Sequence, residues 1–266
     1  IKTVSWHPNP GWRDMPVDID IDINGHAKKK LFSYSVEKQG EQLRRIFGSG
    51  KVLSNRETYI FGSSALGIPS MSTKGYDPDT QAGTDWYDGM NRAFKMMVLW
   101  RVGGVDIIAP HVFFAAGSGE FKGNRNAGPK GSNIDYYGWE YQWRGPHPKT
   151  SAFLMAGHGC NKAAYVGRVY GGGEGVRNFS LYAFQRPDNE AAVFAWAKEK
   201  MKVPLTGPIA GDGSVGILDV FGEPIPNLTV LTEEPVLFRS SSLKPGELLE
   251  RAVSRMSSRV ISNNRP

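Results

Sequence analysis

Cysteine is almost absent from this chain, which has a single one, Cys160, among 266 residues. One cysteine can form no intrachain disulfide and supplies no cysteine-based metal site. Long apolar runs are absent as well, so no segment approaches the roughly 20 apolar residues that span a bilayer. The sequence therefore predicts no membrane span. It begins with Ile1 and shows no signal peptide, and we expect a processed or truncated chain whose compartment its own N-terminus does not reveal.

Dense clusters of positive charge are also scarce, although the net charge is +6. The two richest stretches, residues 28–30 and 251–265, are short and have no aromatic residues between their basic ones. Nucleic-acid binding needs basic residues gathered on one face, so we expect no nucleic-acid partner. His26, His147 and His158 are scattered without metal-ligand spacing. The sequence therefore predicts neither a metal nor a cofactor.

What the first half does contain is an alternation of apolar strands and amphipathic helices. Strands are expected at residues 1–6, 57–62 and 105–117, and helices within residues 29–50 and 85–103, each followed by glycines. This order favours parallel βαβ units. In such units the loops after the strands form the side on which a substrate site lies.

The second half has a different texture. From about Lys162, short strand-like runs are separated by Gly, Pro, Asn and Asp, which is typical of an antiparallel β-sandwich. The tail that ends in SRMSSRVISNNRP is expected to be a solvated helix that frays into disorder. The Gly-rich run at 171–175 precedes a strand and not a helix, so it is not a phosphate site.

Several motifs, taken in order, resemble the C-terminal part of a retaining (β/α)8-barrel glycoside hydrolase with a C-terminal β-sandwich. VSWHPNPG (residues 4–11) resembles the sixth barrel strand, which ends in an aromatic-His pair before Pro. Residues 42–67 resemble the helix and seventh strand, and WRVGGVDIIAPHVFF (100–114) resembles the eighth. ILDVFGEPIPNLTVLTEEPVLF (217–238) resembles the last strands of the sandwich. Each motif is weak alone, and the resemblance rests on their order and spacing.

The resemblance implies an α/β fold made of strands 6–8 of a (β/α)8 TIM barrel, followed by a small antiparallel β-sandwich. It implies three segments: residues 1–161 as the C-terminal part of the catalytic barrel, 162–242 as the sandwich, and 243–266 as a helical or disordered basic tail. Barrel strands 1–5, including the one that carries the acid/base residue, have no counterpart in the sequence. A half barrel has open edges, so we expect a second polypeptide, or a missing N-terminal segment, to supply these strands.

The resemblance also implies a glutamate nucleophile at the end of the seventh strand. Retaining glycosidases use two carboxyl groups about 5 Å apart. If SSALG aligns with the family motif, Ala65 occupies the nucleophile position. Ala65 is then an engineered or natural loss of catalysis, or the alignment is out of register. Glu57 is the nearest carboxylate, and the expected strand at 57–62 puts it at the strand's start, on the wrong face.

Substrate-binding candidates follow the predicted strands. His7 either hydrogen-bonds a sugar or packs beneath a loop, and aromatic rings such as Trp12 can stack on the C–H face of a pyranose. Phe113 could equally belong to the barrel core, and Trp139 could clamp a loop instead of contacting a glycan. The full set of candidates is Trp6, His7, Trp12, Arg13, His111, Phe113 and Trp139.

The function implied by the resemblance is hydrolysis of a polysaccharide or oligosaccharide by double displacement, with a carbohydrate as the substrate and no cofactor. This chain would be a fragment, or one chain, of a larger enzyme and inactive alone. The alternative is a non-catalytic carbohydrate-binding or scaffold subunit. Secretion, as expected of a polysaccharide-degrading enzyme, rests on the resemblance alone.

Overall fold

A computed structural model describes eleven stretches of the chain, which divides into two compact units, Ile1–Phe153 and Leu154–Pro266. Each unit is considered by itself. The described residues are 2–6, 36–58, 90–91, 93–110, 140–141, 145–146, 148–171, 178–198, 201–211, 213–257 and 261–262.

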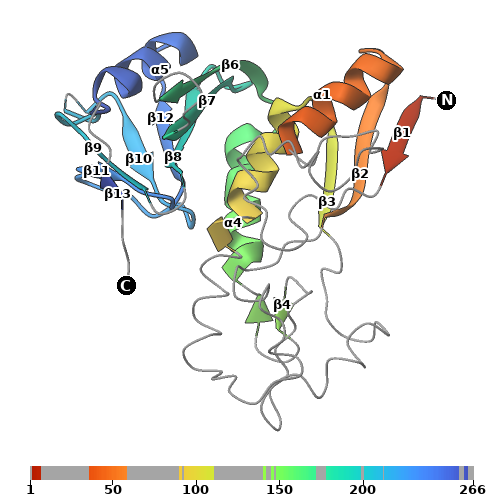
Figure 1. Cartoon of the computed structure of the whole chain (residues 1–266), viewed down its shortest axis with the longest axis horizontal. Helices are drawn as coiled ribbons and strands as arrows, with labels where there is room; N and C mark the ends of the chain where they lie inside the picture. The colour runs from red at the N-terminus through yellow and green to blue at the C-terminus, as the bar shows by residue number, and fades with distance from the viewer. Residues whose placement is uncertain are drawn as a thin grey trace, which may run out of the picture. The chain divides into compact units, whose positions relative to one another are not determined.

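The first unit is built on a three-stranded parallel sheet, in the order β1-β2-β3 (Figure 1). Its strands are β1 (Thr3–Trp6), β2 (Val52–Thr58) and β3 (Ile107–Pro110). Helix α1 (Val36–Phe47) connects the first two, and helical residues 90–91 and 93–102 lie between the second and third. The parallel βαβ arrangement predicted from the alternation is therefore confirmed for these strands. The unit also contains a small antiparallel pair, β4 (Glu140–Tyr141) and β5 (Gly145–Pro146).

Helix 90–102 is buried on almost every side. Ala93, Phe94, Val98 and Trp100 are fully buried, which is typical of a helix enclosed within a fold and not of a surface helix. Two glycines follow it, as the sequence predicts, and Gly104 takes a φ of 80° that favours glycine. The sequence thus determines both the position and the end of this helix.

The side chain of Arg44 ties α1 to the amino-terminal ends of β2 and β3. Its guanidinium donates to the carbonyls of Lys51 and Gly104, and its Nη2 lies 3.0 Å from Asp106 Oδ2. The same carboxylate oxygen accepts a hydrogen bond of 2.8 Å from the amide of Leu53. One cation and one anion thus satisfy backbone groups of β2 and of the turns that precede β2 and β3, and they hold α1 against the sheet.

Replacing Arg44 by alanine should destabilise the first unit by about 1–3 kcal/mol, because several acceptors would lose their donor at once. Hydrogen exchange of amides in residues 36–58 under native conditions would measure the change. Arg45→Ala is the matched control: Arg45 is exposed in the same helical turn, and its loss should cost less than about 0.5 kcal/mol. Equal effects of the two substitutions would refute the role assigned to Arg44.

The second unit contains two antiparallel sheets. The larger has five strands in the order β10-β12-β8-β7-β6, and the smaller has three in the order β11-β9-β13. Helix α4 (Pro148–Cys160) leads into the unit, and α5 (Pro245–Ser254) follows the last strand of the larger sheet. The strands are β6 (Ala164–Gly171), β7 (Phe179–Gln185), β8 (Ala191–Ala197), β9 (Met201–Pro204), β10 (Gly216–Leu218), β11 (Val230–Leu231), β12 (Val236–Ser240) and β13 (Ile261–Ser262).

One face of the larger sheet forms the core of this unit. Successive side chains of a strand alternate between the two faces of the sheet, and Leu181, Val193 and Phe238 lie on this face. They pack with residues of β9, β11 and α5 in a single apolar cluster. The antiparallel strands predicted after Lys162 are therefore present. The predicted β-sandwich is not confirmed beyond the presence of these strands, since helix α5 also lies against the core face of the larger sheet.

The expected basic tail contains two packed elements. Leu248 and Ala252 lie four residues apart on α5, and both are fully buried in the core cluster. Beyond them β13 pairs antiparallel with β9. The solvated helix predicted for this stretch is thus in fact an amphipathic helix with a buried stripe, because the larger sheet offers it an apolar face.

The opposite face of the larger sheet carries aromatic rings and a charged cluster at one end. Arg186 donates 2.7 Å to the carbonyl of His158 on α4 and pairs with Asp188 and Glu190. The hydrogen bond from Arg186 holds the pKa of Asp188 below its usual value, against the opposing effect of desolvation. Arg239 of β12 also pairs with Glu190. These hydrogen bonds and ion pairs connect the β7–β8 turn to α4 and β12.

Candidate functional site

The carboxyl-terminal ends of the three parallel strands meet at one edge of the sheet. Trp6, the last residue of β1, pairs with Asn55, and Thr58, the last of β2, pairs with Pro110 at the end of β3. The register of β2 on β3 shifts between Asn55 and Thr58, which marks a bulge or irregularity near the end of the strand. Bulges are frequent beside active sites, where they redirect a side chain.

Glu57 lies within this irregular stretch, and its position corrects the sequence-based expectation. The sequence predicted a strand at 57–62 with Glu57 at its start. The structure begins β2 at Val52, so Glu57 is the second-to-last residue of Val52–Thr58 and belongs to the carboxyl edge. The expectation was wrong because the polar run SNRE (54–57) is typical of a loop, although these residues belong to the middle strand of the sheet. The signal that could have found Glu57 is the short apolar start Val52–Leu53 immediately after the glycines.

Most of the predicted site residues lie outside the described residues. Trp6 is placed by its backbone at the end of β1, and His7 and His111 directly follow the last residues of β1 and β3 in the sequence. Both histidines lie outside the described residues, so their roles stay predictions. The remaining candidates stay predictions, since the structure does not describe Trp12, Arg13, Ala65, Phe113 or Trp139.

Two buried polar side chains, which sequence reasoning missed, lie on helix 90–102. This helix ends beside the amino-terminal edge, where Gly104 and Asp106 contact Arg44. Its first described turn is about 18 Å away along the helix axis, toward the carboxyl edge. Asn91 and Lys95 are a turn apart there and nearly fully buried. The available signal was the spacing of Asn91 and Lys95, four residues apart among the apolar residues of this helix.

Asn91 is only 6% exposed, and within the part of the chain that the structure describes its buried Oδ1 has no hydrogen-bond partner. An unsatisfied buried acceptor costs about 1–3 kcal/mol, and so needs an explanation. A hydroxyl group could supply the hydrogen bond that Oδ1 lacks. At and toward this edge, the described residues therefore include Glu57, placed by its backbone near the end of β2, and the buried side chain of Asn91.

The described residues hold no group of three His, Cys, Asp or Glu side chains arranged to bind a metal ion. Within the same stretches, every helix is too short or too polar to cross a bilayer.

Comparison with known proteins finds weak structural likeness only. No protein-family model matches the chain, and no curated protein matches its sequence. The structure is similar to an Anoxybacillus α-amylase described as a glycosyl hydrolase, with a TM-score of 0.36 and 13% identity over 75% of this chain and 41% of that one. It is also similar to a bifunctional glucanase-xylanase from a metagenome library, with a TM-score of 0.35 and 10% identity over 90% of this chain and 43% of that one. The chain thus spans about two fifths of each glycosidase, and likeness at this level assigns it neither a fold family nor an activity.

Proposed function

We propose that this chain carries part of the active site of a retaining glycoside hydrolase, with Glu57 as the nucleophile. The observation that carries the proposal is the position of Glu57 at the carboxyl end of the middle strand of a parallel sheet. Catalytic residues of (β/α)8 enzymes come from the ends of such strands. The resemblance drawn from the sequence expects a glutamate at the end of this very strand. Glu57 meets that expectation within the strand as the structure bounds it, whereas Ala65 lies seven residues beyond Thr58.

The proposed chemistry is double displacement. The carboxylate of Glu57 attacks the anomeric carbon while a second carboxylic acid protonates the departing oxygen, and water then hydrolyses the glycosyl-enzyme ester. The resemblance assigns the second carboxyl group to the fourth barrel strand, which this chain does not supply. His7 and His111, which follow β1 and β3 in the sequence, would hydrogen-bond the sugar.

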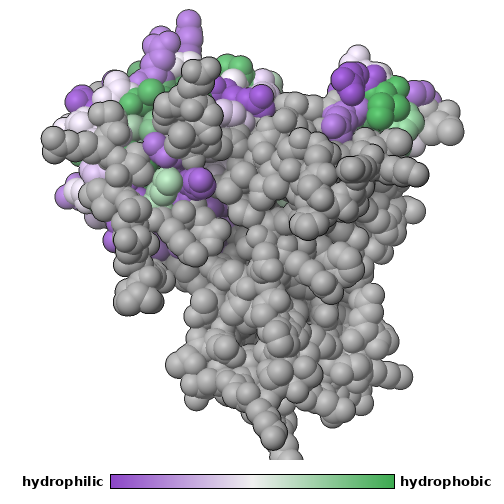
Figure 2. Space-filling view, viewed as in Figure 1, coloured by the Kyte–Doolittle hydropathy of each residue, from purple (hydrophilic) through white to green (hydrophobic). Residues whose placement is uncertain are grey.

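A second polypeptide or another segment that completes the sheet belongs to the same proposal. All-parallel sheets are normally covered on both faces. In β2 the side chain of Leu53 is fully buried, whereas Val52, on the opposite face, is 37% exposed and Ile107 of β3 is 51% exposed. Ile46 and Phe47, at the end of α1, are also exposed. Figure 2 shows hydrophobic surface among the described residues on this side of the view. Within the described residues, β1 and β3 are the two edges of the sheet. Further parallel strands with their helices would cover these surfaces.

Covalent labelling tests the proposal directly. Activated 2-deoxy-2-fluoro glycosides, in gluco, xylo and manno configurations, should form a stable adduct that is visible by intact mass spectrometry of the purified protein. Tryptic cleavage after Arg56 and Lys74 releases residues 57–74, in which Glu57 is the only residue with a carboxylate side chain. The adduct should lie on this peptide. A label on a different peptide would refute the role of Glu57, and the absence of any label with glycan binding retained would favour the non-catalytic alternative.

A further inference from the structure

We draw no further inference here: the strongest candidate, the sheet face of the first unit on which Val52 of β2 and Ile107 of β3 are exposed, already belongs to the proposed function, and nothing in the structure shows which partner covers it.

Discussion

Glu57→Gln should lower kcat for aryl glycosides by at least about a thousandfold, equivalent to ~4 kcal/mol in the activation free energy. A neutral amide cannot attack the anomeric carbon to form the ester intermediate. Initial rates on nitrophenyl glycosides, with the protein assembled as it occurs, measure this loss. Glu57→Ala adds a specific readout, because azide can enter the space left by the carboxylate and restore turnover, giving a glycosyl azide of inverted configuration.

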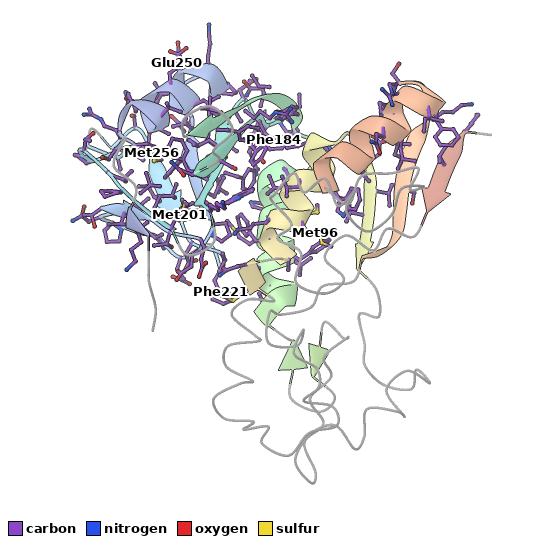
Figure 3. The ribbon with its side chains drawn as sticks, viewed as in Figure 1. Met96, Phe184, Met201, Phe221, Glu250 and Met256 are labelled. Atoms are coloured by element: carbon purple, nitrogen blue, oxygen red, sulfur yellow. The ribbon has the colours of Figure 1, made fainter. Side chains whose placement is uncertain are left out.

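The controls separate Glu57 from its alternatives. Glu250→Gln removes a carboxylate that projects from α5 into solvent (Figure 3), and it should leave the rate unchanged. If Ala65 instead holds the nucleophile position, Glu57→Gln will have no effect and Ala65→Glu will create activity. If Glu57→Gln leaves the rate of an active protein unchanged, Glu57 is therefore not the nucleophile.

Phe194→Ala should destabilise the second unit by about 3–5 kcal/mol, the usual cost of truncating a buried phenylalanine. Phe194 is fully buried, and its ring lies 5.6 Å from that of Phe184 in an edge-on arrangement. It also packs so closely on α4 that a Cβ added at Gly159 would lie 2.6 Å from it. Truncation would leave a cavity between the sheet and the helix. Native-state hydrogen exchange of the β7 and β8 amides measures the change.

The same substitution at Phe221 provides the comparison. Phe221 is 48% exposed in a turn fixed by hydrogen bonds to Asp219 Oδ1 from its own amide and that of Glu223. Its side chain contributes little to this turn, so Phe221→Ala should cost less than about 1 kcal/mol. If both substitutions lowered the free energy of unfolding by a similar amount, the face of the sheet that carries Phe194 would not be tightly packed.

Local patterns in the sequence were enough for the type and order of several elements. The apolar spacing from Met90 to Val98, followed by Gly103 and Gly104, predicted an amphipathic helix and its end. The helix and its end are confirmed, although the helix is buried on almost every side. The runs around β7 and β8 predicted strands, and these pair antiparallel over seven residues. Such patterns succeed because periodicity and glycine punctuation act between residues close together in the chain.

The position of β2 depended on distant partners. Alone, residues 52–58 look less strand-like than the apolar run after them. The backbone of Val52 donates to Lys2, however, and Leu53 accepts from Asp106, so β1 and β3 set where the strand begins. Because the strand begins at Val52 and not at residue 57, Glu57 lies near its end, and Glu57 replaces Ala65 as the candidate nucleophile.

The sequence by itself therefore determined the alternation of helices and strands in the first half and the antiparallel texture of the second, because these depend on near neighbours. Only the tertiary structure decided that Glu57 belongs to the carboxyl edge and that Leu248 and Ala252 are buried. Each of these outcomes rests on register or burial between segments far apart in the chain, which no local pattern encodes.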